Sequence, residues 1–472
     1  MKNLITAITI IFLLFDYSLA QAPDTLWTKA IGDTSNDAGA SIVQKADGGF
    51  IVCGSKGTEI ITDAYTTDIW IINTDENGNV INSNTYGGME SVEIIPTSDN
   101  GYMLLANTFT PQGNNFEDII LLKLNENGDT MWTKTINLMW SDYGREIHET
   151  LDSGFIILFR STGNPNGIRL FRTNSLGDTL WTKIYNTSNG SAQITDDNGF
   201  VFLSYKDSTW VSKEDSSGNI EWIKSYHSEF RGSKIIKTND PGYYIAGQTY
   251  PDPFGPPQDI GVMKINDNGD SLWFQSYPIT NFNSLLGRVS KTSDDELIIS
   301  GATSVDGSSF EDGLLLKVDA NGILKWSKMI GGLDEEFLRD THQLDNGTYV
   351  SVGRTASFGA GAWDLWLLKF TQDPTEVSKD FLTTVDDFEL SQNYPNPFNP
   401  STTIKFSLPS SGYATLKIYN ALGEEVAVLM DNELTSGAYE VEWNASGLPS
   451  GVFFYQLKTE GFLETKKMLL LK

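Results

Sequence analysis

One short pattern recurs seven times along the chain, and this repetition limits the possible folds more than any other feature. Each copy opens an apolar run, in most cases with Gly followed by an aromatic residue, and neighbouring copies are 43 to 54 residues apart. The copies lie at Gly49-Phe50, Gly101-Tyr102, Gly154-Phe155, Gly199-Phe200, Gly242-Tyr243, a degenerate Glu296-Leu297, and Asn346-Gly347. A period of this length with four strand signals is typical of a β-propeller blade.

The strands of the first unit are expected at Ser41–Lys45, Phe50–Gly54 and Asp68–Asn73, with a fourth from Val80 onward. Asn-Gly between two alternating runs is a strong hairpin signal. It precedes the fourth strand in four units, at Asn77-Gly78, Asn127-Gly128, Asn268-Gly269 and Asn321-Gly322. A Trp follows four residues after the turn Gly in most units, and we expect these side chains to pack between blades.

The two ends of the repeat region complement each other. The last unit stops at Lys369 without a fourth strand, while the chain carries an unassigned strand at Asp24–Lys29 that is nearly identical to Asp178–Lys183. An N-terminal strand that completes the last blade would close the ring and remove its exposed edges. The fold class is therefore predicted to be all-β, with a seven-bladed β-propeller over residues 24–370.

Residues 1–20 have the organisation of a signal peptide. Lys2 precedes an apolar run at Leu4–Phe15, and Ser18-Leu19-Ala20 provides a small-x-small cleavage site. The apolar run is too short to span a bilayer as a helix, and no later stretch is long enough, so no transmembrane segment is expected. Cys53 is the single cysteine, which excludes an intrachain disulfide, and we interpret it as a buried apolar residue. These features predict a secreted protein or one on the outer cell surface.

A net charge of −28 disfavours binding to nucleic acid or to anionic lipid. No catalytic motif is present, and the three histidines, His148, His227 and His342, are too few and too dispersed for a zinc cluster. Calcium is the one cofactor that a sequence pattern suggests. The turn Asn73-x-Asp75-x-Asn77-Gly78 resembles half of a calcium loop, but position 84 is Asn instead of the required Glu, so hairpin geometry explains it. We therefore predict no catalytic, cofactor or metal residues.

The spacing of Gly and Trp also resembles the Asp-box of sialidase propellers, although the Trp comes one residue late. A sialidase would need an arginine triad, and the arginines of this sequence show no matched blade positions. The Trp residues are therefore interpreted as packing between blades.

The third strand of most blades opens with an acid and ends with a base. The acids are Asp68, Asp118, Asp259, Asp312 and Asp364, and the bases five residues later are Lys123, Arg172, Lys213, Lys264, Lys317 and Lys369. An odd separation places acid and base on opposite faces of the strand. One interpretation is that each Asp accepts hydrogen bonds from the preceding loop and each base is a solvated strand end. The alternative is a ring of rim carboxylates that binds cations or sugar hydroxyls.

The loops between second and third strands differ in length, and loops on a rigid scaffold often carry recognition. The stretch Tyr250–Pro257 is rich in proline, and Tyr250 and Phe254 offer stacking faces for a ligand. We take these two residues as candidate ligand contacts.

Residues 371–388 are polar and acidic and form a predicted linker. Short alternating strands then suggest an Ig-like β-sandwich over 389–472, with strands at Thr403–Leu408, Ala414–Asn420, Tyr439–Trp443, Val452–Lys458 and Lys466–Leu471.

This region resembles the type A sorting domain of the type IX secretion system. The matching positions are Tyr394, Pro395, Asn396, Pro397 and Phe398 at its entry, the turn glycines Gly423 and Gly451, and the basic pair Lys466 and Lys467 near its end. The resemblance implies passage through the outer membrane, with the secretion machinery and its sortase as partners.

Three functions remain open from the sequence. The first is non-catalytic binding of a glycan, polymer or protein at the cell surface. The second is hydrolysis of polysaccharide, which paired acids converging on the central funnel would favour. The third is a structural spacer.

Overall fold

The computed structural model describes residues 22–57, 67–88, 90–109, 117–137, 140–163, 165–187, 189–226, 229–250, 258–280, 284–304, 311–332, 334–373, 389–393, 396–408, 412–434, 437–459 and 462–471. The proposed signal peptide, most of the linker, His227, Phe254, Tyr394 and Pro395 lie outside these residues. The chain divides into two compact units, Met1–Thr375 and Glu376–Lys472. Each is described by itself.

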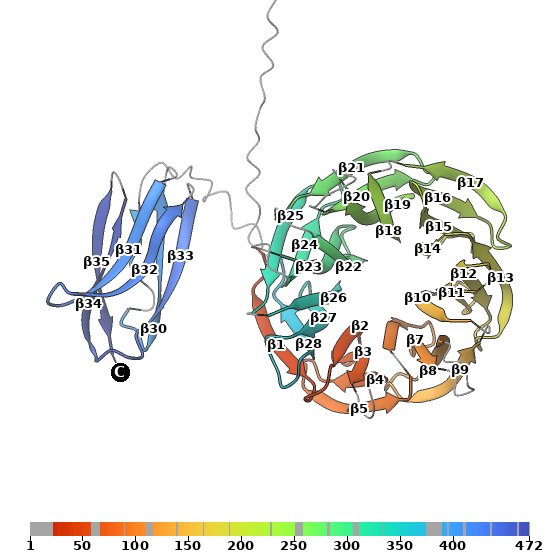
Figure 1. The fold of residues 1–472 in the computed structure, drawn as a ribbon, viewed down its shortest axis with the longest axis horizontal. Coiled ribbons are helices and arrows are strands. Elements are labelled where there is room, and N and C mark those ends of the chain that lie inside the picture. Colours follow the sequence, from red (N-terminus) through yellow and green to blue (C-terminus); the bar gives the residue numbers. More distant parts are fainter. Residues whose placement is uncertain are drawn as a thin grey trace, which may run out of the picture. The chain divides into compact units, whose positions relative to one another are not determined.

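The first unit is a ring of seven four-stranded antiparallel sheets, which we call blades 1 to 7 (Figure 1). Blade 1 contains β2 (Ala38–Gln44), β3 (Phe50–Gly57), β4 (Thr67–Thr74) and β5 (Val80–Tyr86). Blade 2 contains β6 (Glu90–Pro96), β7 (Tyr102–Phe109), β8 (Glu117–Leu124) and β9 (Thr130–Ile136). Blade 3 contains β10 (Asp142–Glu149), β11 (Phe155–Ser161), β12 (Gly167–Thr173) and β13 (Thr179–Tyr185).

Blade 4 contains β14 (Gly190–Ile194), β15 (Phe200–Tyr205), β16 (Thr209–Glu214) and β17 (Ile220–Ser225). Blade 5 contains β18 (Phe230–Lys237), β19 (Gly242–Thr249), β20 (Asp259–Asn266) and β21 (Ser271–Tyr277). Blade 6 contains β22 (Ser284–Lys291), β23 (Leu297–Thr303), β24 (Asp312–Val318) and β25 (Leu324–Ile330). Blade 7 contains β26 (Glu336–Gln343), β27 (Tyr349–Thr355) and β28 (Asp364–Phe370), and its outer strand is β1 (Thr25–Ile31).

The predicted closure of the ring is confirmed. β1 pairs antiparallel with β28, with Thr28 opposite Leu368 and Ala30 opposite Trp366. The indole Nε1 of Trp366 also donates a 2.7 Å hydrogen bond to Thr28 Oγ1. The last blade is thus assembled from both ends of the propeller sequence (Figure 1).

The fourth-strand tryptophans pack across blade junctions, as expected. A Cβ on Gly78 of blade 1 would lie 2.6 Å from the Trp27 ring of blade 7, and a Cβ on Gly269 of blade 5 would lie 2.8 Å from the Trp222 ring of blade 4. Both glycines also adopt positive φ, so the turn leaves room for the neighbouring indole only because no side chain is present. Most of the buried apolar side chains likewise form clusters shared by two adjacent blades.

The expectation that the third-strand bases are solvated is wrong for four of them. Lys123, Arg172, Lys264 and Lys317 are buried. Each bonds an acid of the turn between first and second strands, as in Lys123–Asp99 at 2.8 Å and Lys317–Glu296 at 3.0 Å. These bases therefore hold the hairpin between the first and second strands of their own blade in place.

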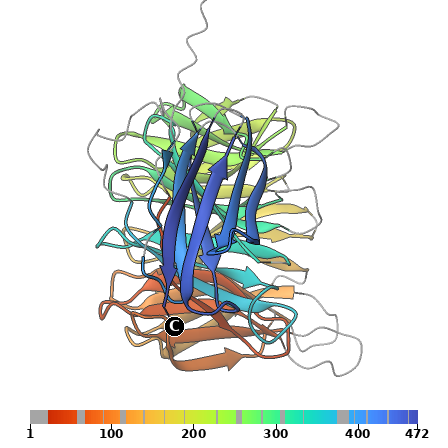
Figure 2. The same ribbon diagram turned by 90° about the vertical axis from the view of Figure 1, so that its left-hand side faces the viewer.

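The second unit is a β-sandwich of two antiparallel sheets, whose four-stranded sheet can be followed in Figure 2. One sheet contains β29 (Glu389–Leu390), β30 (Ser401–Leu408) and β33 (Gly437–Asn444). The other contains β32 (Glu425–Leu434), β31 (Gly412–Asn420), β34 (Gly451–Lys458) and β35 (Leu463–Leu470). Both sheets contribute to one apolar core, which includes Ile404, Trp443 and Tyr455. The sequence prediction missed β32 because two irregularities in its pairing with β31 break the alternation of side chains.

Candidate functional site in the propeller channel

The first strands surround the centre of the propeller, and in six of the seven blades their register with the second strand is interrupted by an irregularity (Figure 1). A β-bulge adds a residue that re-aims its side chain. Arg145 in β10 and Arg339 in β26 are the inserted residues of their blades, and in β22 the irregularity spans Gly287 and Arg288. Arg145 and Arg339 therefore occupy equivalent places around the channel, whereas Arg288 lies one residue further along, at the place that Glu146 holds in blade 3.

A second set of arginines lies on the second strands. Arg160 in β11 and Arg354 in β27 each precede the last residue of their strand, opposite Tyr143 and Phe337 respectively. Blades 3 and 7 thus carry the same two arginines at the same two places. The statement that no arginines are matched between blades is therefore wrong. Counting from the aromatic residue that starts the second strand, instead of from the glycine, would have revealed the match: Arg145 and Arg339 stand ten residues before it, and Arg160 and Arg354 five after it.

These arginines line a cavity of about 590 Å³ at one end of the channel. We call this cavity the arginine cup, and its cations are Arg145, Arg160, Lys234, Arg288, Arg339 and Arg354. The other residues that line the cup are mostly small or have neutral polar side chains, and Glu90 and Glu146 are its acids. The cup lies at the ends of the second strands, on the face from which the loops to the third strands emerge.

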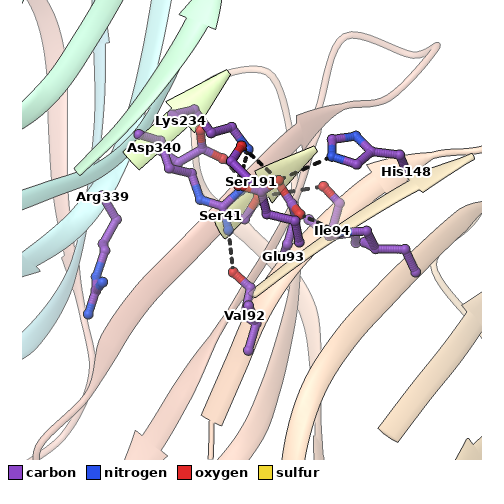
Figure 3. Close-up of polar contacts among 12 residues, drawn as sticks. Ser41, Val92, Glu93, Ile94, His148, Ser191, Lys234, Arg339 and Asp340 are labelled. Carbon is purple, nitrogen blue, oxygen red and sulfur yellow. Dashed lines mark hydrogen bonds and ion pairs between the residues drawn. The ribbon is translucent and has the colours of Figure 1, made fainter. Parts of the chain in front are cut away.

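Ion pairs that cross the channel form the bottom of the cup (Figure 3). Arg288 of blade 6 bonds Glu93 of blade 2, and its Nη2 donates a 2.6 Å hydrogen bond to the Val92 carbonyl. Lys234 of blade 5 bonds Glu146 of blade 3 at 3.1 Å. A second cavity of about 470 Å³ lies on the other side and is also lined by Lys234 and Arg288. We call these two cross-channel ion pairs the channel floor.

The acids of the floor also join neighbouring blades. Glu93 Oε2 accepts a 2.8 Å hydrogen bond from the backbone N–H of Ile147 in blade 3. Glu146 Oε2 accepts one of 3.1 Å from Ala192 in blade 4. In the same way, Asp340 of blade 7 accepts one of 3.2 Å from Ile42 in blade 1. Each of these acids directly follows a first-strand bulge, so the bulge positions a repeated contact between blades.

Two of these acids stand between a serine and a histidine. Asp340 accepts a hydrogen bond from Ser41 Oγ at 2.8 Å and lies 3.1 Å from His342 Nε2. Glu146 has the same arrangement with Ser191 and His148 (Figure 3). Because the acid occupies the central place, the serine bonds the carboxylate and not the imidazole. This order does not make the serine a nucleophile, which needs a base at its hydroxyl.

The electrostatics keep these acids ionised. Burial opposes the charge of Glu146, yet Lys234 and His148 lower its pKa to about 2. Burial also opposes the charge of Asp340, but His342 and Arg288 hold its pKa well below the usual range. Burial would lower the pKa of His342, and its contact with Asp340 raises it instead.

The five predicted rim carboxylates all lie at the start of third strands, and they point to different partners. Asp364 Oδ2 accepts 2.9 Å hydrogen bonds from the backbone N–H groups of Ala360 and Gly361, which belong to the loop before it. Asp118 Oδ2 accepts one of 3.1 Å from Asn137 Nδ2, and Asp259 Oδ2 one of 3.5 Å from Ser276 Oγ. Asp68 and Asp312 are half-buried. None of the five lines the arginine cup.

Two of these carboxylates meet an acid of the next blade. A Cβ on Gly32 would lie 2.1 Å from Asp364 Oδ1 and 2.6 Å from Asp37 Oδ2. Asp37 accepts hydrogen bonds from the backbone N–H groups of Asp33 and Gly57. Asp312 meets Glu336 beside Gly331 in the same manner. Asp364, Asp37 and Glu336 bind the backbone of adjacent loops, and all four acids lie outside the lining of the arginine cup. Across the described ranges, no group of three or more His, Cys, Asp or Glu has the geometry to hold a metal ion.

Tyr250 lies at the base of the loop that the sequence singled out, two residues beyond the cup residue Gln248. The guanidinium of Arg231 is 4.1 Å from the Tyr250 ring centroid and 5.0 Å from that of Tyr205. Tyr250 is therefore held by a cation–π contact near the mouth of the cup. Phe254 is outside the described residues.

In the sandwich, the entry segment lies against the last strand. Phe398 exchanges backbone hydrogen bonds of 3.0 Å with Leu469 and Leu471, and Asn396 Oδ1 accepts one of 2.9 Å from Leu469. Pro397 lies between them, Gly423 adopts positive φ in the turn after β31, and Gly451 begins β34. Lys466 and Lys467 are in β35, with Lys467 exposed. Of the described chain, no helix is long and apolar enough to cross a membrane.

Comparison with known proteins identifies this second unit. Residues 392–471 match the family described as the secretion system C-terminal sorting domain. No curated protein matches the chain. Among solved structures, the chain is similar to BamB from Moraxella catarrhalis (12% identity, 74% of this chain and 100% of that chain, TM-score 0.40). It is also similar to a fungal alcohol oxidase of the AA5 family in complex with copper (10% identity, 96% of this chain and 100% of that chain, TM-score 0.49). A third similar structure is YCF48 bound to D1 peptide (10% identity, 75% of this chain and 100% of that chain, TM-score 0.44).

At these identities and TM-scores, the solved structures carry no argument about ligand or activity. The sorting domain indicates export to the cell surface or secretion. The chain is thus a seven-bladed propeller protein with a type IX secretion sorting domain at residues 392–471.

Proposed function

We propose that this protein is an exported, non-catalytic binding protein that holds an anionic ligand in the arginine cup. The observation that carries the proposal is the matched placement of arginines in blades 3 and 7. Five of the chain's eight arginines line this one cavity, in a protein whose net charge is −28. Their concentration there runs against the overall charge of the molecule and marks the cup as a place for negative charge.

Three of the five cup arginines are not consumed by internal ion pairs. Among the described residues, the guanidinium groups of Arg145, Arg160 and Arg339 form no ion pair and donate no hydrogen bond. Figure 3 draws Arg339 with no hydrogen bond or ion pair to the other residues shown, and its guanidinium lies 5.4 Å from the Phe337 ring centroid. Placing like charges side by side costs free energy, which Glu90 and Glu146 offset only in part. An oxyanion bound between the arginines would offset more of that cost.

The acids of the channel floor, Glu93 and Glu146, favour binding over hydrolysis. A glycosidase needs one carboxyl group that is protonated near neutral pH. Glu146, with its pKa of about 2, stays ionised, and its oxygens bond Lys234, Ser191, His148 and the Ala192 N–H. Glu93 is likewise bonded to Arg288 and to the Ile147 N–H. These groups maintain the channel floor and are not available as general acids.

The proposal is tested by calorimetric titration of the full chain without its signal peptide. The probes are a galacturonate trisaccharide, a sulfated disaccharide, a triglutamate peptide and a neutral galactose trisaccharide. We expect at least one anion to bind, more weakly as salt is raised, and the neutral sugar to bind much less. The double variant Arg145→Gln/Arg339→Gln should lose this binding.

The matched control is Lys206→Gln/Lys224→Gln, which removes the same charge from exposed places outside the cup. Retained affinity in the arginine double variant, or equal loss in the lysine control, would refute a specific site in the cup. Failure of all three anions to bind would refute the proposed function itself.

A further inference from the structure

The arginine cup contains two like pairs of arginines on opposite sides of the ring. Arg145 and Arg160 belong to blade 3, and Arg339 and Arg354 belong to blade 7. Figure 1 shows β10 and β11 across the channel from β26 and β27. Because each pair combines a bulge residue with the penultimate residue of the second strand, the two pairs are built alike. We call them the blade 3 pair and the blade 7 pair.

Each pair has donors without an acceptor. The Nε of Arg160 and the Nε of Arg354 are buried and have no hydrogen-bond partner within the described residues. Arg354 Nη2 donates a 3.0 Å hydrogen bond to Glu335, and the Arg354 guanidinium lies 4.1 Å from the centroid of the Trp363 ring. These two contacts position the side chain. Because these Nε atoms have almost no solvent exposure, a ligand in the cup cannot reach them and would bond the other guanidinium nitrogens of the arginines that line it.

The two members of a pair repel each other. Arg145 and Arg339 are exposed in the cup, where partial desolvation by the channel walls and the adjacent charges of Arg160 and Arg354 lower their pKa values. Glu146 and Glu90 partly oppose these shifts. A planar oxyanion beside each pair would relieve this repulsion and accept two parallel N–H bonds from a guanidinium.

The lining between the two pairs is suited to hydroxyl groups. It includes Ser55, Asn107, Asn189 and Gln248, together with the single aromatic residue Tyr143. Amide and hydroxyl side chains both donate to and accept from sugar hydroxyls. Large apolar side chains are scarce there, with Leu286 the largest. Such a surface suits a saccharide better than the apolar side chains of a peptide.

We propose that the cup binds an acidic saccharide through two carboxylates at once, one held by the blade 3 pair and the other by the blade 7 pair. This inference rests on the proposed function and adds the class of ligand and its number of charges. The ligand is a uronate oligosaccharide or the uronate-bearing end of a longer chain.

The test compares galacturonate with its dimer and trimer by titration into the full chain without its signal peptide. Once one carboxylate of an oligomer is bound, the second carboxylate is held near the other arginine pair at a high effective concentration. An oligomer long enough to reach both pairs should therefore bind more tightly than the monomer, by about tenfold or more. The blade 3 variant Arg145→Gln/Arg160→Gln should bind that oligomer only as tightly as the monomer. The blade 7 variant Arg339→Gln/Arg354→Gln should behave in the same way.

The remaining pair in each variant provides the internal control. Both variants should still bind the monomer, which shows that the cup is folded, and the quadruple variant should not. Equal affinity for monomer and oligomers, or loss of the oligomer advantage in only one variant, would refute the two-pair model and leave the proposed function standing. Tighter binding of triglutamate or of a sulfated disaccharide than of the trimer would refute the assignment to uronate.

Discussion

Asp142, the first residue of β10, lies in an environment that should destabilise the folded protein at neutral pH. Its side chain is fully buried, and within the described residues no hydrogen bond of normal length and angle reaches either carboxylate oxygen. Burial raises its pKa to about 6; Asp118 adds to the effect, while the Ser161 hydroxyl and Arg169 partly oppose it. We therefore predict that Asp142→Asn, which resembles the protonated acid, stabilises the propeller.

The size of the effect follows from the difference between the pKa of the Asp142 carboxyl group in the folded protein and its pKa in the unfolded chain. Its pKa is about 6 in the folded protein and roughly 4 in the unfolded chain, a difference of about 2 units, or about 3 kcal/mol. Because the folded-state pKa is the higher one, the penalty is fully present above about pH 6 and disappears below about pH 4. The advantage of Asp142→Asn should follow the same pH range.

The assay is urea unfolding of wild type and Asp142→Asn at about pH 7.5 and at about pH 4. We expect the variant to be more stable by up to about 3 kcal/mol at the higher pH, and equal to wild type at the lower pH. A variant that is no more stable at the higher pH, or whose advantage does not change with pH, would refute the reasoning.

Glu336→Gln provides a matched control with the opposite sign. Glu336 begins the first strand of blade 7, as Asp142 begins that of blade 3. Its Oε1 accepts hydrogen bonds from Thr355 Oγ1 and the Ser357 N–H, and its Oε2 accepts one from the Gly332 N–H. An amide would turn an NH₂ group toward one of these donors, at a cost of about 1–3 kcal/mol.

Four further predictions follow from the fold. Deleting Asp24–Ile31 removes β1 and should lower the unfolding temperature of the propeller, and an unchanged temperature would exclude the closure as a stabilising element. Residues 389–472 fused to a periplasmic reporter should carry it out of a type IX-competent cell, whereas a retained reporter would count against export by this domain. Cys53 is buried, and burial raises its pKa to about 12, so thiol reagents should modify it only after unfolding. Tyr250→Ala/Phe254→Ala should weaken binding of the galacturonate trimer without a lower melting temperature; full affinity would remove this loop from the site.

The blades and their closure could be read from the sequence because they depend on local signals. A turn, an alternating run and a recurring Trp are each contained within one repeat, and the unassigned strand Asp24–Lys29 completes the count. The buried state of Lys317 was not predictable in this way, because its partner Glu296 lies 21 residues earlier, in the turn between the first and second strands of the same blade.

The arginine cup was missed for a geometric reason. A bulge shifts the side-chain alternation by one residue, and blade 7 has an extra residue between Gly347 and Tyr349, so counting from glycine misaligns Arg339 with Arg145. The contact between Glu93 and Arg288 depends on the whole ring, since these residues are 195 positions apart in the sequence and meet only across the channel.

The pairing of β1 with β28 also determines how the propeller bears mechanical load. The sorting domain follows β28 in the chain, so tension applied from the C-terminal side enters the propeller at Phe370. In blade 7 this strand lies between β27 and β1 and is bonded on both sides. Were β28 an outer strand, the same tension would separate a single ladder one bond at a time. Here two ladders must rupture together, so the propeller should resist tension from its C-terminal side better than one that ends on an outer strand.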